Sequence, residues 1–285
     1  MQRPTVPTRI PGSTPIPNMF GPEKTFNILQ WSVTSHRTPI LSQTRTEEYS
    51  TLLDVFSLPE MLFDSKLYVE NKETGFKLEF NALDGLKNAK TDVLQNEGVS
   101  GVKVGCAWDT KNINAAFQDG TKTIEERDDN IDWTFTTLYK GSMSIKGSEN
   151  QPVIEDTTEG VDYERLKRRD PILFYDELVL YEDELHDHGT GQLSVKTRFM
   201  GEYAYILLRF FLRVDGVVVR VIDNRFYTDY SKDYWLRETS YLESSYDDLA
   251  KKSVNVKEPT LMADPNQLLP KLNCKIKKTV KIYVK

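Results

Sequence analysis

The chain has few of the residues that build metal and disulfide sites, with two cysteines and three histidines among 285 residues. Cys106 and Cys274 lie far apart in the sequence and form no metal-type pair, which favours a reduced cytosolic or nuclear protein over a disulfide scaffold. No stretch offers about 18 consecutive apolar residues, and residues 1–22 contain no apolar run typical of a signal peptide. We therefore expect a soluble intracellular protein that does not span a membrane.

Acidic residues are absent from both ends of the chain. Residues 1–20 contain two arginines and no acid, and 271–285 contain six lysines and no acid, so the middle of the chain carries a net charge of −14. An acidic body repels phosphate backbones, which argues against nucleic-acid binding. Six of the 13 prolines fall within the first 22 residues. We predict a flexible proline-rich arm over 1–24 and a basic tail over 271–285, as a solvated arm or an edge strand.

The chain also lacks the short motifs of common enzyme sites, including HExxH, GxGxxG, GxxxxGK[ST], GxSxG and CxxC. Its densest group of potential ligands is YEDELHDHG at 181–189, with four acids and two histidines. On a strand, four of these side chains would point to one side and could hold zinc or iron. They are Glu182, Glu184, His186 and His188.

A single linear segment rarely completes a metal coordination sphere, so we interpret 181–189 mainly as the start of a turn at 189–191. Its acids would then pair with Arg209, Arg213 or Arg220. The alternative function is a metal-dependent hydrolase that uses Glu184, His186 and His188. A third, a scaffold that recruits an SH3-type domain, rests only on the PxxP pattern at 4–7.

β-rich runs dominate the ordered part of the chain, with a few helical segments between them. This order predicts one α+β domain over 25–270, built on antiparallel sheets, and no pattern calls for a cofactor. Strands are predicted at 26–35, 66–71, 75–82, 101–108, 131–141, 172–184, 192–200, 203–214 and 217–227. Helices are predicted at 47–56, 83–89, 159–170 and 240–252, and a loop at 111–130.

The strongest local signal is Asp215-Gly216 between two β-rich runs, which favours a two-residue hairpin turn. That turn would place Leu208 opposite Asp223 and Phe210 opposite Val221. One face would carry Leu208, Phe210, Leu212, Val214, Val217, Val219 and Val221, and would end in Asp223 and Arg225. The other would carry Arg209, Phe211, Arg213, Val218, Arg220 and Ile222. Asp223 and Arg225 would then mark either the end of the core or the rim of an apolar groove that binds a peptide.

Six blocks carry a resemblance to a known family. They are SLPEMLF (57–63), FKLEFNALDGL (76–86), DWTFTTLYKG (132–141), LYEDELHDHG (180–189), LSVKTRFM (193–200) and LLRFFLRVDGVVVRVIDNR (207–225). In this order and spacing they resemble the TIPRL, or TIP-forty-one-like, family of regulators of TOR signalling, over roughly 26–240. We expect a fungal member of this family. The proline-rich arm and the lysine-rich tail lie outside the matched blocks.

The resemblance implies a non-enzymatic regulator of cytoplasmic location, with the nucleus as a second location. Its partners would be catalytic subunits of type 2A-family serine/threonine phosphatases (2A, 4 and 6), and also the alpha4-like subunit. It further implies a cleft that receives the phosphatase and its C-terminal tail. Carried onto this chain, the cleft positions are Asp84, Val161, Val221 and Asp223. The two carboxylates would accept hydrogen bonds from the partner, and Asp223→Leu would weaken binding at least tenfold without unfolding the chain.

Overall fold

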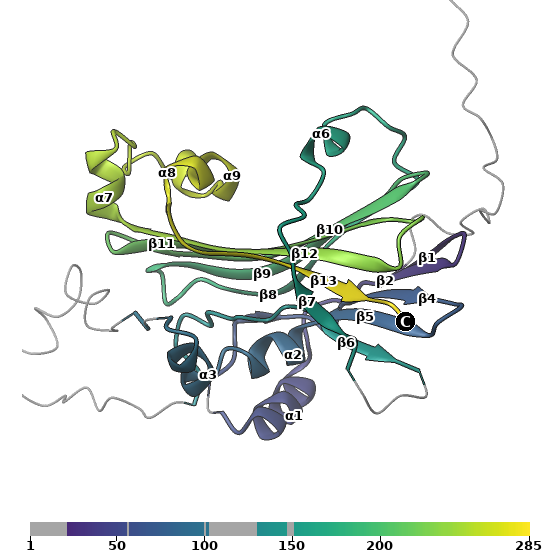
Figure 1. The fold of residues 1–285 in the computed structure, drawn as a ribbon. Helices are drawn as coiled ribbons and strands as arrows, with labels where there is room; N and C mark the ends of the chain where they lie inside the picture. The colour runs from purple at the N-terminus through teal and green to yellow at the C-terminus, as the bar shows by residue number, and fades with distance from the viewer. Residues whose placement is uncertain (1–21, 56, 100, 103–129, 147–150) are drawn as a thin grey trace, which may run out of the picture.

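The protein consists of two antiparallel β-sheets packed face to face, with short helices on either side (Figure 1). The structure is a computed structural model that describes residues 22–55, 57–99, 101–102, 130–146 and 151–285. This architecture confirms the predicted α+β class. The predictions for 1–21 and 103–129 lie outside the described residues. No helix in the described ranges is long and apolar enough to cross a membrane.

The smaller sheet, in the described part of the chain, has the strand order β1-β2-β4-β5-β6. Its strands are β1 (Glu23–Ile28), β2 (Trp31–His36), β4 (Lys66–Asn71), β5 (Phe76–Asn81) and β6 (Ser142–Ile145). The helices α1 (Gln43–Leu53), α2 (Ala82–Lys87) and α3 (Thr91–Asn96) lie on the same side of the molecule as this sheet (Figure 1). Together they form the lower layer.

The larger sheet, again over the described residues, has the order β3-β8-β9-β10-β11-β12-β13-β7. Its strands are β3 (Met61–Leu62), β7 (Ile154–Asp156), β8 (Phe174–Asp183), β9 (Gly189–Phe199), β10 (Tyr203–Val214), β11 (Val218–Asp229), β12 (Tyr234–Ser245) and β13 (Asn273–Tyr283). The helices α6 (Tyr163–Leu166), α7 (Tyr246–Lys251), α8 (Pro259–Met262) and α9 (Pro265–Leu268) lie above it (Figure 1), followed by the 3-10 turn Leu269–Lys271. We call the face beneath these helices the outer face.

The main core lies between the two layers and is rich in aromatic contacts. Trp31 of β2 meets Trp235 of β12 edge to face, with ring centroids 5.5 Å apart. Phe80 of β5 meets Phe226 of β11 in the same way at 5.4 Å. Each such pair adds about 1 kcal/mol to the burial of its rings. These contacts hold the sheets face to face.

The central strands β10 and β11 are buried on both faces, as their burial patterns show. A strand covered on both sides needs apolar residues at nearly every position, which is why β10 has the run ILLRFFL. The strands of the smaller sheet alternate between buried and more exposed positions instead. The unusual feature of β10 and β11 is that their buried outer positions include charged residues.

The hairpin between β10 and β11 has a different register from the predicted one. Its turn spans Asp215–Val217, and Gly216 has a φ of +75°, which glycine adopts without strain. Val217 is the additional loop residue, so Phe211 pairs with Val221 and Arg209 pairs with Asp223. A shift of one residue moves every side chain of one strand to the other face. The two predicted faces were therefore wrong.

Three further predictions are corrected by the structure. Residues 26–35 form two strands, β1 and β2, because Leu29 has a φ of 50° in a turn between them. Residues 131–141 are not a strand, since Phe135 has a φ of 53° and buried threonines use their hydroxyls for hydrogen bonds, as Thr137 does to the Gly85 carbonyl. The predicted helix at 240–252 begins only at Tyr246, after β12.

The lysine-rich segment is an internal strand of the larger sheet. β13 pairs with β12 along its length and with β7 on its other side. The boundary predicted at residue 270 thus does not separate a tail from the fold. Its lysines mostly point to solvent, as the exposed pattern of residues 273–278 shows. Strand pairing, rather than apolar composition, places this segment in the domain.

The turn between β8 and β9 lies within YEDELHDHG, earlier than the predicted turn at 189–191. Leu185, His186 and Asp187 all have positive φ angles, between 52° and 65°. Asp183 stabilises this rare conformation, since its carboxylate accepts hydrogen bonds from the amides of Leu185 (2.7 Å) and Glu60 (2.9 Å). The Leu185 side chain is fully buried in the main core. The segment therefore has a structural role.

Gly189 closes this turn against the β10–β11 hairpin. A Cβ at Gly189 would lie 1.8 Å from the Arg213 carbonyl oxygen. We expect Gly189→Ala to lower the free energy of unfolding by about 3 kcal/mol, because the obstacle is backbone that cannot rotate away. Denaturant unfolding measures this change. Gly201→Ala, where a Cβ would meet no atom within 4 Å, is the control, and an equal loss in both variants would contradict the prediction.

Candidate functional site

The structure brings three of the four predicted site residues to the outer face of the larger sheet. Val221 and Asp223 lie on β11, and Val161 precedes α6 on the same side. Asp84 lies in α2, in the lower layer on the opposite side of the sheet. The predicted cleft positions therefore form one group of three and one separate residue.

Val221 is fully buried beneath the C-terminal helices. It belongs to a cluster with Phe211, Val219, Leu249, Met262, Leu268 and Leu272. These residues come from β10 and β11 and from the segment that contains α7, α8 and α9. We call this cluster with its helices the C-terminal lobe. Val221 thus packs beneath the C-terminal lobe, and its side chain is not exposed to a partner.

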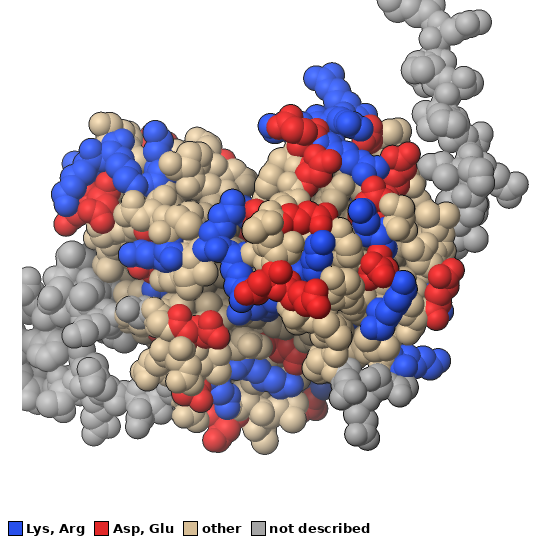
Figure 2. Space-filling view, in the orientation of Figure 1, with Lys and Arg blue, Asp and Glu red and all other residues tan. Residues whose placement is uncertain are grey.

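Val161 lies in a second apolar cluster at the other end of the outer face. Its neighbours are Met200, Tyr203, Tyr227 and Leu236, and it is 6% exposed. Arg165 of α6 stacks on Tyr203 at 4.5 Å and forms an ion pair with Asp229 at 2.5 Å. We call this cluster with α6 the α6 lobe. Figure 2 shows a notch between the two lobes.

Asp223 lies on the floor between the lobes and is 0% exposed. Both of its oxygens accept hydrogen bonds from Arg209, at 2.7 and 2.8 Å, and Arg225 donates a further one at 2.5 Å. A buried carboxylate is stable only with such paired donors. Asp223 therefore holds the side chains of two arginines in place. It has no exposed surface with which to contact a partner directly.

The network continues in both directions across the floor. Arg209 donates to the side chain of Asn266 in α9 at 2.8 Å. Arg225 donates to Ser240 and lies 3.4 Å from Glu238, whose carboxylate also accepts a hydrogen bond from the Tyr163 hydroxyl of α6 at 2.5 Å. A continuous polar chain thus joins one lobe to the other and fixes the geometry of the notch.

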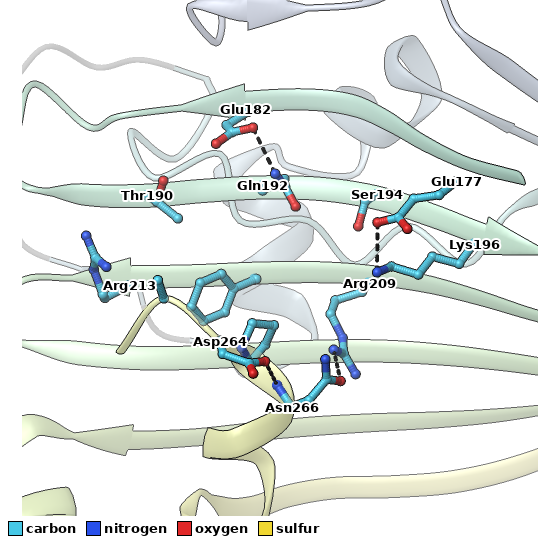
Figure 3. Close-up of a pocket in the computed structure, with 13 residues that line it drawn as sticks. Glu177, Glu182, Thr190, Gln192, Ser194, Lys196, Arg209, Arg213, Asp264 and Asn266 are labelled. Carbon is cyan, nitrogen blue, oxygen red and sulfur yellow. Dashed lines mark hydrogen bonds and ion pairs between the residues drawn. The ribbon is translucent and has the colours of Figure 1, made fainter. Parts of the chain in front are cut away.

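A cavity of about 530 Å³ opens beside Arg209, against α8 and α9. Figure 3 shows Arg209 and Asn266 on one side of it and Glu177 and Lys196 on another. Phe211 supplies an apolar wall, and Ala263 lies at the α8 edge. The charged lining residues carry both signs. A cavity of this size with mixed polar and apolar walls can hold a few residues of a peptide.

Asp84 forms its own polar group in the lower layer. Its side chain accepts hydrogen bonds from Ser142 (2.5 Å), Asn81 (3.0 Å) and Lys87 (3.0 Å). Burial alone would raise the pKa of Asp84, but these three donors outweigh it and hold the pKa below its usual value. It borders a separate cavity of about 350 Å³ with Asn88 and Lys140.

The three side chains that a metal-dependent hydrolase would use, Glu184, His186 and His188, do not come together in one site. Glu184 and His186 are exposed on the turn, whereas His188 is buried. Within the described ranges, no group of three or more His, Cys, Asp or Glu side chains could hold a metal ion. The predicted partners of the acids were also wrong, because Arg209 binds Asp223, Arg213 binds Asp215 and Arg220 binds Glu243.

Comparison with known proteins places the chain in a family. Residues 61–250 match the model of the TIP41-like family, and the chain belongs to that family. It is 37% identical to a TIP41-like protein of Dictyostelium discoideum over 89% of this chain and 90% of that protein. It is 37% identical to a human TIP41-like protein over 84% and 81%. It is also 35% identical to a Saccharomyces cerevisiae protein named type 2A phosphatase activator TIP41, over 79% and 64%.

Sequence reasoning missed the residues that build the notch. Arg209 was predicted on the face opposite to Asp223, because the predicted β11 register was wrong by one residue, and Asn266 lies in a segment with no strong pattern. Tyr163 appeared only as part of a predicted helix. The available signal was the density of arginines within apolar strands, at Arg209 and Arg225, because a charge in such a position needs a buried partner. That partner could be identified only with the correct register.

Removal of Asp223 should destabilise the protein as well as affect binding. We expect Asp223→Leu to lower the free energy of unfolding by about 3–5 kcal/mol, since it leaves the buried Arg209 guanidinium without its carboxylate and removes one of the two carboxylates paired with the partly buried Arg225. Denaturant unfolding at pH 7 tests this. Asp247→Leu, at an exposed position in the first turn of α7, should change stability by less than about 1 kcal/mol. Equal stability of Asp223→Leu and the wild type would show that the network is not stabilising.

Asp84 should contribute stability that depends on pH. Its folded pKa is lowered, so the wild type should be more stable than Asp84→Asn at pH 7 by about 1 kcal/mol. This advantage should be fully present above the unfolded pKa of about 4 and be lost as the pH falls through the folded pKa. Thermal unfolding of both proteins between pH 2.5 and 7 measures it, and a constant difference would contradict it.

Proposed function

We propose that this protein is a non-enzymatic regulator that binds the catalytic subunit of type 2A-family serine/threonine phosphatases. Family membership supports the phosphatase as partner, because yeast relatives are named type 2A phosphatase activators. The observation that carries the binding mode is the notch between the two lobes, with its fixed charged floor and the cavity at Arg209. Such a surface suits a flexible segment of a partner better than a small substrate.

In this proposal, the C-terminal tail of the phosphatase lies in the notch. Arg209 and Asn266 would provide hydrogen-bond donors at the cavity, while the Phe211 wall would contact an apolar side chain. Asp223 would act through Arg209, and Val221 and Val161 would act by supporting the two lobes. A rigid floor reduces the entropy lost on binding, which favours affinity for an otherwise flexible tail.

The finer features of the proposal concern the cellular setting. The partners would include the type 2A, 4 and 6 catalytic subunits and also the alpha4-like subunit. The protein would act in TOR signalling, in the cytoplasm and in the nucleus. These features rest on the resemblance of the six sequence blocks.

The test is a titration of the purified protein with a type 2A catalytic subunit, intact and without its C-terminal tail, by calorimetry. We expect micromolar or tighter binding that weakens when the tail is removed. Ala263→Trp should weaken binding of the intact subunit about tenfold or more, because the indole would fill the exposed α8 edge of the cavity without altering the core. Glu73→Trp, in the exposed turn between β4 and β5, is the matched control.

A separate variant distinguishes the two faces of the molecule. Asp84→Ala alters the lower layer and leaves the notch unchanged. Weaker binding by Ala263→Trp alone would support the notch, and weaker binding by both variants would add a second contact surface. If only Asp84→Ala weakened binding, the notch would not be the site. If the wild type bound neither form of the subunit, the phosphatase proposal would fail.

A further inference from the structure

Part of one edge of the larger sheet, along β13, is not covered by another strand in the described part of the chain. β13 pairs with β12 along its length, but β7 pairs with its other side only at 280–282. The Thr157 amide still donates to the Thr279 carbonyl, and the chain then leaves the sheet toward α6 (Figure 1). Residues 273–278 therefore form an open edge strand, which we call the β13 edge.

The backbone of the β13 edge has hydrogen-bonding groups to offer. In an antiparallel pair, every second residue directs its N–H and C=O away from the partner strand. Among the described residues, the only contact beyond β12 is the Cys274 thiol, a weak donor, 3.6 Å from the Ile276 carbonyl. All of 273–278 is exposed. At about 3.4 Å per residue, the β13 edge is about 20 Å long, which suits an extended segment of similar length.

The side chains along the β13 edge are mainly basic. Lys277 and Lys278 are each paired with one carboxylate. Lys275, and Lys271 just before the strand, are exposed and form no ion pair with any residue that the structure describes. Figure 2 shows basic side chains over the part of the molecule where β13 runs. This edge is positive although the chain as a whole carries a net charge of −6.

The charge of the β13 edge determines which strand could pair with it. Lysines on an open edge repel a second copy of the same edge and so prevent self-association. The same lysines attract carboxylates, since opposite charges on paired strands are stabilising. Ile276 is 41% exposed and lies on the opposite face from Lys277, because neighbouring side chains on a strand alternate. A segment that alternates acidic and apolar residues would match both faces.

We propose that the β13 edge binds an extended acidic segment of a partner protein, which adds to the larger sheet as a further strand in line with β7. Main-chain hydrogen bonds would provide affinity, and carboxylates beside the lysines would provide selectivity. None of residues 273–278 lines the cavity at Arg209 in the notch. The proposal therefore does not depend on the phosphatase as partner.

The test uses the full chain and three fluorescent peptides. The first is acetyl-Glu-Val-Glu-Val-Glu-Val-amide, the second is the same peptide with every backbone amide N-methylated, and the third has lysine in place of glutamate. Binding is measured by fluorescence anisotropy, and amide hydrogen exchange locates the bound peptide. The variant is Lys271→Glu with Lys275→Glu, which breaks no described ion pair. The control is Lys146→Glu with Lys167→Glu, the same change of charge at two exposed positions outside β13.

We expect the wild type and the control to bind the glutamate peptide, with slower hydrogen exchange at 274–278. The N-methylated peptide should bind at least tenfold more weakly, because it cannot donate to the strand. Lys271→Glu with Lys275→Glu should bind the glutamate peptide at least tenfold more weakly than the wild type, and the lysine peptide more tightly.

Four results would overturn the proposal. They are absence of glutamate-peptide binding by the wild type, equal binding of the N-methylated peptide, an equal loss of binding in the variant and the control, and slower exchange only outside 274–278. Sedimentation of the wild type alone tests a second copy as the occupant. A dimer that the glutamate peptide dissociates would assign the β13 edge to that second copy and would also overturn the proposal.

Discussion

The register of the β10–β11 hairpin is the constraint on which the rest of this structure depends. One additional turn residue, Val217, pairs Arg209 with Asp223 and turns both toward the outer face. The same register directs Leu208 and Phe210 into the main core between the sheets. A two-residue turn would have moved the β11 side chains alone to the opposite face, which would have separated Asp223 from Arg209 and turned it toward the main core.

The turn in YEDELHDHG supports that hairpin from the neighbouring strands. Its three residues of positive φ are stabilised locally by Asp183, and Leu185 fastens the turn to the core. Gly189 then allows β9 to approach the Arg213 carbonyl closely. A segment with the composition of a metal site therefore connects two strands, and its Asp183 carboxylate accepts hydrogen bonds from backbone amides.

The arginines on the two faces of the larger sheet differ in how their charges are paired. In the notch, Arg209 and Arg225 are paired with Asp223, and Arg225 is also paired with Glu238, so the charges of the floor are balanced. On the inner face, Arg237 of β12 lines a cavity that we call the inner cavity, and it has no such partner among the described residues. The first arrangement suits a partner recognised by shape and hydrogen bonds. Asp84 lies apart from the notch, but the cavity it borders shares Glu97, Leu138 and Lys140 with the inner cavity.

The sequence by itself determined the antiparallel α+β class, most strands of the larger sheet and the family, because period-two patterns and ordered sequence blocks are local properties. It did not determine the hairpin register, the absence of a strand at 131–141, or the inclusion of the lysine-rich segment as β13. The grouping of Val161, Val221 and Asp223 apart from Asp84 was also decided by the tertiary structure. Register depends on one turn residue, and strand pairing and burial depend on distant partners that no local pattern encodes.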